Sequence, residues 1–147
     1  MKKWTTAALV IPGTYLLDQA TKQLAQAMIA PGDSVRVLPI LDLVHMHNTG
    51  AAFSMGVTLG NGFFITMASA AIVVIAYMLW KDMEHPLSLS LILGGAAGNL
   101  TDRIRIGSVH DFLYFHIGNH YWPAFNVADS ALTVGVALII VMALRKK

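Results

Sequence analysis

The chain has 147 residues, of which 56% are hydrophobic and only 12% are charged, whereas ordinary soluble domains carry about 25% charged residues. This length and composition predict a single integral membrane domain covering residues 1–147. The formal net charge of +2 is too small to indicate nucleic acid binding. The absence of cysteine excludes disulfides, thiolate metal sites and cysteine nucleophiles.

Four apolar segments follow one another along the chain, at about residues 4–29, 62–80, 87–106 and 125–144. The second contains no charged residue and has about the 20 residues that a bilayer-spanning helix requires. The first is interrupted by Asp18 and Lys22, and the third becomes rich in glycine and polar residues toward its end. We therefore predict a membrane all-α fold with four transmembrane helices.

The Lys and Arg residues predict how these helices are oriented. Six of them precede the first segment, join the second to the third, or follow the fourth. The positive-inside rule makes that side cytoplasmic, so both termini are expected to be cytoplasmic. The connection at about 30–61 and the segment at about 107–124 are then extracytoplasmic.

Each of these two outer segments has a recognisable composition. The stretch from Ser34 to His47 is β-prone and is broken by Pro39, which predicts a small strand-rich lobe. The segment at about 107–124 is rich in Trp, Tyr and Phe, which predicts a position at the water–lipid interface.

The N-terminus offers an alternative interpretation, because its two lysines, apolar stretch and Ala25-Gln26-Ala27 are similar to a cleavable signal peptide. However, Asp18 and Lys22 lie between the apolar stretch and that tripeptide, where an export signal rarely carries charge. We therefore expect the first segment to be retained as a helix.

Polar residues at membrane depth are the best indication of a functional site, because they are costly there unless they are used. Asp18 and Lys22 are four residues apart and predict an ion pair, either purely structural or positioning other groups. Asn99 and Arg103 have the same spacing, and Arg103 is expected to need an acidic partner, either Asp102 or an aspartate from another segment. The small residues 94–98 before them predict close helix packing.

The fourth segment begins with Asn126 and Asp129, three residues apart, which is a spacing typical of a helix N-terminus. Capping alone would not explain Asp111, a second aspartate expected at the same interface. Two close carboxylates share a proton, so that one can activate water while the other polarises a peptide carbonyl.

Other chemistries have weaker support. The sequence has six histidines, including His45, His47 and His110, but no H-E-x-x-H motif, so metal catalysis is not expected. No G-x-S-x-G motif is present, and a Ser–Lys pair would require Ser54 or Ser130 beside Lys22. A proton- or ion-coupled transporter that uses the aspartates as a relay, or a structural scaffold, stays open on these residues alone.

Five motifs occur in order along the chain: DQATK at 18–22, NTGAAFS at 48–54, GGAAGNLTDR at 94–103, VHDF at 109–112 and FNVADS at 125–130. With them, the chain resembles the bacterial lipoprotein signal peptidase (signal peptidase II) family over essentially its full length. The resemblance implies a membrane aspartyl endopeptidase in which Asp111 and Asp129 are the catalytic pair. Residues that match positions lining or ordering the site are Asp18, Lys22, Asn48, Gly50, Asn99, Arg103 and Asn126.

The same resemblance implies the substrate and the location. The substrate is a diacylglyceryl-modified prolipoprotein, cleaved just before the lipidated lipobox cysteine, with no metal or organic cofactor. The cyclic peptide globomycin is the expected inhibitor. The enzyme is expected to be a monomer in contact with membrane lipid, in the bacterial cell (inner) membrane, with its active site near the extracytoplasmic interface.

Overall fold

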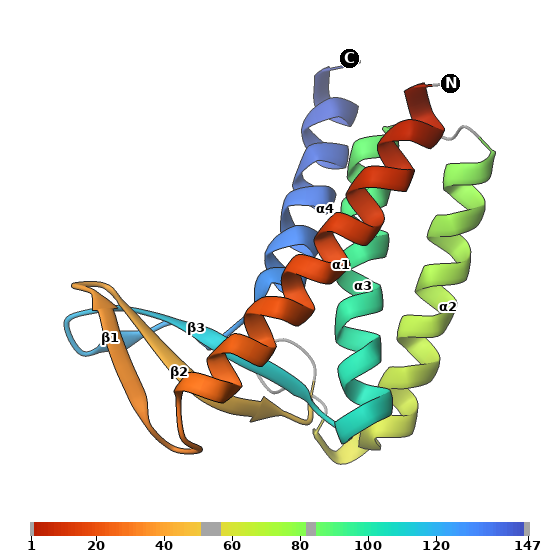
Figure 1. The fold of residues 1–147 in the computed structure, drawn as a ribbon. Helices are drawn as coiled ribbons and strands as arrows, with labels where there is room; N and C mark the ends of the chain where they lie inside the picture. Colours follow the sequence, from red (N-terminus) through yellow and green to blue (C-terminus); the bar gives the residue numbers. More distant parts are fainter. Residues whose placement is uncertain (1, 51–56, 82–84, 146–147) are drawn as a thin grey trace.

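The computed structural model describes residues 2–50, 57–81 and 85–145, and within them four long helices form one bundle. The bundle places the start of the first helix and the end of the last at its same end, with a small sheet at the other (Figure 1). The helices are α1 Lys2–Met28, α2 Gly60–Trp80, α3 Pro86–Ile106 and α4 Val127–Arg145, and a short 3-10 helix, η2 Val57–Leu59, precedes α2.

Two of the described helices, α2 and α4, are long and apolar enough to cross a membrane by length and composition. Helix α3 lies at the centre of the bundle and packs against α1, α2 and α4. The most buried polar side chains of the bundle come from α1 and α3, which lowers the hydropathy of these two helices. Large apolar side chains are instead exposed on the outside of the bundle, including Leu9, Leu16, Val73, Trp80, Val134 and Ile140.

Glycines in α3 allow the central helices to approach closely. A Cβ built on Gly94 would lie 2.7 Å from the Cβ of Thr14, and one on Gly95 would lie 2.6 Å from the carbonyl oxygen of Ala128. Contacts this short cannot form without a shift of the neighbouring helix. The packing role predicted for residues 94–98 is therefore confirmed.

The sheet has four antiparallel strands in the order β1-β2-β3-β4. Strands β1 (Ser34–Leu38) and β2 (Leu41–Asn48) are separated at Pro39, as the sequence predicts. Strand β3 (Val109–Ile117) pairs with β2, and β4 (His120–Tyr121) completes the sheet. The predicted helix-rich fold with a small strand-rich lobe is thus confirmed.

The sequence interpretation missed strand β3. The segment at 107–124 is not simply an aromatic interfacial stretch, because its residues 109–117 form a strand that joins the lobe to the helices. Its aromatic and β-branched residues suit a pleated, half-buried surface, and β2 supplies the hydrogen bonds that they need. Phe112 of this strand packs with Ala25 and Ile29 at the end of α1, so the backbone beside Asp111 is fixed to the bundle.

Candidate active site

Asp129 lies in the first turn of α4, where Asn126 caps the helix. The side-chain oxygen of Asn126 accepts a hydrogen bond from the backbone N–H of Asp129 (2.9 Å), and the backbone N–H of Asn126 donates to the Asp129 carboxylate (3.3 Å). This reciprocal arrangement is a capping box with aspartate in the third position. The capping role predicted for these two residues is confirmed.

Asp111 approaches the same turn from strand β3. The side-chain amide of Asn126 donates to Asp111 Oδ1 at 2.7 Å, and that of Asn48, at the end of β2, donates to Asp111 Oδ2 at 3.3 Å. Asp111 is 3% exposed. Burial and, second, the negative charge of Asp129 raise the pKa of Asp111 to about 7, against the hydrogen bonds from the two amides. This carboxyl can therefore hold a proton near neutral pH.

A third asparagine, Asn99 of α3, positions Asp129 from the other side. Its side-chain amide donates to Asp129 Oδ1 at 2.8 Å. Its oxygen accepts hydrogen bonds from Lys22 Nζ at 2.9 Å and from the Asn126 amide at 3.2 Å. Since the lysine fixes which end of the Asn99 side chain is the acceptor, it also fixes the amide that points to Asp129.

Lys22 forms the ion pair with Asp18 that the sequence predicts, and it also binds a second carboxylate. Its Nζ lies 2.9 Å from Asp18 Oδ2 and 2.7 Å from Asp102 Oδ2, with all three groups buried. The other oxygen of Asp18 accepts the backbone N–H of Ala128 at 2.9 Å. The pair thus neutralises buried charge and also holds the start of α4.

Asp102 and Gln19 belong to this support, although neither was among the predicted site residues. The Gln19 amide donates to Asp102 Oδ1 at 3.0 Å, to Asp18 Oδ2 at 3.2 Å and to the Gly98 carbonyl at 3.3 Å. Asp102 Oδ2 accepts the backbone N–H of His110 at 3.3 Å, which links α3 to strand β3 directly before Asp111. The only sequence signal for Gln19 was its place inside the first motif.

Arg103 was expected to form an ion pair with an acidic residue, and among the described residues this expectation was wrong. No ion pair of Arg103 occurs there; its guanidinium donates to the carbonyl oxygen of Gly50 and lies 4.6 Å from the ring centre of Phe64. A carbonyl and an aromatic face stabilise the cation, which also lies within electrostatic range of Asp102, Asp111 and Asp129. Asp102, the neighbour of Arg103 in the sequence, forms its ion pair with Lys22 instead.

Gly50 and Asn48 connect this arginine to the carboxylates. The Gly50 N–H donates to Asn48 Oδ1 at 2.9 Å, which turns the amide of Asn48 toward Asp111. The remainder of this motif, residues 51–54, lies outside the described residues, and so does the candidate nucleophile Ser54. The hydroxyl of Ser130 is bonded to the Asn126 carbonyl at 3.0 Å, a backbone contact within its own helix.

Among the described residues, no group of three or more His, Cys, Asp or Glu side chains is arranged to hold a metal ion. His110 is fully buried, and burial together with the neighbouring His45 and His47 lowers its pKa to about 4. His110 is therefore neutral near pH 7.

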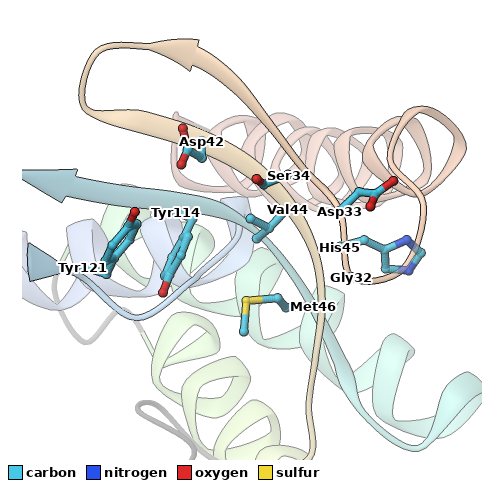
Figure 2. Close-up of a pocket in the computed structure, with 9 residues that line it drawn as sticks. All are labelled: Gly32, Asp33, Ser34, Asp42, Val44, His45, Met46, Tyr114 and Tyr121. Carbon is cyan, nitrogen blue, oxygen red and sulfur yellow. The ribbon is translucent and has the colours of Figure 1, made fainter. Parts of the chain in front are cut away.

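A separate hollow of about 360 Å³ lies on the lobe, with Asp42 on its wall (Figure 2). Asp111 and Asp129 are not among its lining residues. Asp42 pairs with Arg36 at 2.9 Å and His116 at 3.5 Å, and the hydrogen bond from Arg36 holds the pKa of Asp42 below its usual value. Asp42 is consequently an ionised carboxylate with a cationic partner, unlike Asp111.

The family model described as Signal peptidase (SPase) II matches residues 10–145. The chain belongs to the signal peptidase II family. Curated lipoprotein signal peptidases are similar to it: that of Thermodesulfovibrio yellowstonii is 46% identical over 89% of both chains, and that of Paraburkholderia phymatum is 40% identical over 97% of this chain and 88% of its own.

A solved structure described as a bacterial membrane enzyme has the same fold. It superposes with a TM-score of 0.87 at 34% identity, over 96% of this chain and 88% of that chain. A second one, also described as a bacterial membrane enzyme, has a TM-score of 0.85 at 33% identity, over 97% and 95%. Membership of the family makes the protein an aspartic-type peptidase and sets aside the transporter and scaffold alternatives.

Proposed function

We propose that this protein is a membrane aspartyl endopeptidase that cleaves diacylglyceryl-modified prolipoproteins just before the lipidated cysteine of the lipobox. Family membership supports the coarser activity, removal of signal peptides from prolipoproteins. The observation that carries the two-carboxylate mechanism is the convergence of Asp111 and Asp129 on Asn126, whose side-chain amide donates to the Asp111 carboxylate and whose backbone N–H donates to the Asp129 carboxylate. The two carboxylates come from a strand and a helix. Among the described residues, the other acidic pair that shares the donors of one residue, Asp18 and Asp102 on Gln19, also binds the cation of Lys22.

In the proposed mechanism the two carboxylates share one proton. The ionised carboxylate takes a proton from a water molecule as the water oxygen attacks the scissile carbonyl carbon. The protonated carboxyl donates a hydrogen bond to the carbonyl oxygen, and the resulting tetrahedral intermediate collapses as the C–N bond breaks. A proton passes to the leaving amine, which yields a new carboxylate and a new amino terminus and restores the shared proton.

The amides of Asn48, Asn99 and Asn126 orient the pair without neutralising it. Each of them donates to a carboxylate oxygen and therefore favours the ionised form of its partner. Burial opposes this effect at Asp111. The balance supports one ionised and one protonated carboxyl near neutral pH, as the mechanism requires.

The proposed setting is the bacterial cell membrane, with all four helices spanning it and both termini cytoplasmic. The lobe and the carboxylates then lie at the extracytoplasmic interface, where a peptide anchored by its acyl chains presents the bond to be cleaved. The buried polar groups of α1 and α3 face the other helices instead of the outside of the bundle, which supports spanning despite their charge. A monomer contains every residue of this mechanism.

The experiment that tests this proposal compares two forms of one precursor. The purified protein in detergent is expected to cleave the diacylglyceryl-modified prolipoprotein and to leave the unmodified precursor intact, and globomycin is expected to block the cleavage. Products are separated by gel electrophoresis, and the new amino terminus is identified by mass spectrometry. Equal cleavage of the unmodified precursor would refute the proposed substrate class.

A further inference from the structure

A pair of histidines on the outer lobe is not used by the proposed mechanism. His45 and His47 are two residues apart on strand β2, so their side chains point to the same face of the sheet. Their Nε2 atoms face each other at 3.3 Å. His45 is half-buried, whereas His47 is exposed and open to ions in solution.

The surroundings of His45 fix the state of its ring. Its Nδ1 lies 2.9 Å from the backbone carbonyl oxygen of Ile29. A carbonyl oxygen can only accept, so Nδ1 carries a hydrogen, and in the neutral form of the ring Nε2 presents a lone pair toward His47. Neutral histidine ligands in metalloproteins are usually oriented in this way, by a carbonyl or carboxylate on the far ring nitrogen.

His47 is held by a comparable contact. Its Nδ1 lies 3.1 Å from the hydroxyl oxygen of Ser108, which can accept or donate. When Ser108 accepts, two Nε2 lone pairs face each other, and this arrangement repels unless a cation lies between them. When Ser108 donates, the proton on His47 Nε2 fills the same space. The space between the two Nε2 atoms can therefore hold either one cation or one hydrogen-bonding proton.

The separation also matches a metal chelate. Two Zn–N bonds of about 2.0–2.1 Å at a near-tetrahedral angle place their nitrogens about 3.3 Å apart. We propose that His45 and His47 form a two-histidine binding site for a divalent transition-metal ion such as Zn²⁺ or Cu²⁺, with water completing the coordination. Imidazole nitrogen suits these ions, whereas Mg²⁺ and Ca²⁺ prefer oxygen.

Two neighbours favour this site. His45 shares the lining of the lobe hollow with Asp33, an exposed carboxylate that adds negative charge near the pair (Figure 2). On the other side, the ring of His110 lies 4.7 Å from that of His45, centre to centre, and neither of its nitrogens has a hydrogen-bond partner among the described residues. The fully buried His110 forms a wall of the site and is not counted as a ligand.

The proposed metal site lies next to the residues that position Asp111, but it takes no part in the proposed reaction. His47 directly precedes Asn48 and pairs in register with His110, which directly precedes Asp111. An ion on His45 and His47 would restrain the end of β2, and the hydrogen bond between His45 and the carbonyl of Ile29 would extend this restraint to the residue after α1. Its expected effect is a rise in the thermal stability of the protein.

The test uses the full chain in detergent, prepared without a polyhistidine tag, and one equivalent of Cu²⁺ or Zn²⁺. We expect an electron paramagnetic resonance spectrum with hyperfine structure from two imidazole nitrogens for Cu²⁺, and a higher Tm with Zn²⁺. His47→Ala is expected to weaken Cu²⁺ binding at least about tenfold and to abolish the shift in Tm. His120→Ala, which removes an exposed histidine of β4 paired with Ile117 at the end of β3, is the matched control and should bind like the wild type.

Two results would overturn the proposal. One is a wild-type protein that shows neither the two-nitrogen spectrum nor the shift in Tm, as expected for a neutral hydrogen-bonded pair. The other is unchanged metal binding in His47→Ala. His45→Asn serves as a second variant, since its side-chain amide nitrogen can take the place of Nδ1 and still donate to Ile29 while one imidazole ligand is lost.

Discussion

The side-chain nitrogen of Asn126 donates a hydrogen bond to the Asp111 carboxylate at 2.7 Å. The side-chain oxygen of the same residue accepts the backbone N–H of Asp129 and so caps the first turn of α4. One asparagine thereby sets the position of both carboxylates. It fixes a strand residue and a helix residue relative to each other through groups on opposite sides of one planar amide. Asn126 consequently couples the positions of the two carboxylates, which Asn48 and Asn99 each hold from another side.

The two roles of Asn126 can be separated by substitution. Asn126→Ser keeps a good cap for α4 but is too short to hold Asp111, so stability should stay near that of the wild type while kcat falls by about 10²-fold. Asn126→Ala loses both contacts, and the free energy of unfolding should fall by about 1 kcal/mol in addition. Thermal unfolding and turnover of the two variants provide the comparison. Full activity of Asn126→Ser would show that Asp111 needs no such bond.

Gly98 leaves room for the carboxylate that holds the start of α4. A Cβ at this position would lie 2.5 Å from Asp18 Oδ2. Gly98→Ala is therefore expected to lower the free energy of unfolding by about 1–3 kcal/mol, as overpacking usually does. Gly13→Ala on α1 is the control, because nothing lies within 4 Å of its added Cβ and alanine favours a helix. Equal stability of the two variants would contradict the packing described for α1 and α3.

Arg103 is expected to act through the Gly50 carbonyl, since no described carboxylate pairs with it. Arg103→Ala should reduce kcat by about tenfold or more, because the turn that orients Asn48 loses its anchor. Arg105→Ala is the matched control, since Arg105 is exposed in the same last turn of α3. The measurement is the turnover of the two variants, after circular dichroism has shown that both have the same helix content. A fully active Arg103→Ala variant would remove this residue from the site.

The pKa of Asp111, raised to about 7, predicts how activity and stability depend on pH. Turnover requires the shared proton, so it should decline as the pH rises through about 7. The native state binds this proton more tightly than the unfolded chain does, so stability should fall with rising pH between about 4 and 7. Asp111→Asn should remove that part of the slope. Unfolding midpoints at several pH values check it, and an unchanged slope would count against the raised pKa.

The sequence predicted the parts of the fold that follow from simple patterns. Apolar runs indicated the helices, Pro39 indicated the break between β1 and β2, and the spacing of Asn126 and Asp129 indicated a capped helix. Strand β3 was missed because its aromatic residues fit an interfacial segment equally well. Its strand conformation depends on pairing with β2, a non-local partner that local composition does not specify.

The site residues were predicted mainly through motifs. The errors in that prediction, like the missed strand, concern contacts that the local sequence does not specify. Phe64 gave no signal and Gln19 gave none beyond its place in the first motif, since an amide and an aromatic ring in apolar segments have many uses. The acidic partner expected for Arg103 followed from charge alone. A backbone carbonyl and a ring face satisfy that cation instead, and neither can be recognised in a sequence.

The most direct test of the central claim is the rate of cleavage of a diacylglyceryl-modified prolipoprotein by Asp111→Asn and Asp129→Asn. Each substitution keeps the shape of the side chain but removes the shared proton from the pair. We predict that each variant folds in detergent and loses cleavage by about 10²–10⁴-fold or more. Cleavage at the wild-type rate by either variant would contradict the assignment of Asp111 and Asp129 as the catalytic pair.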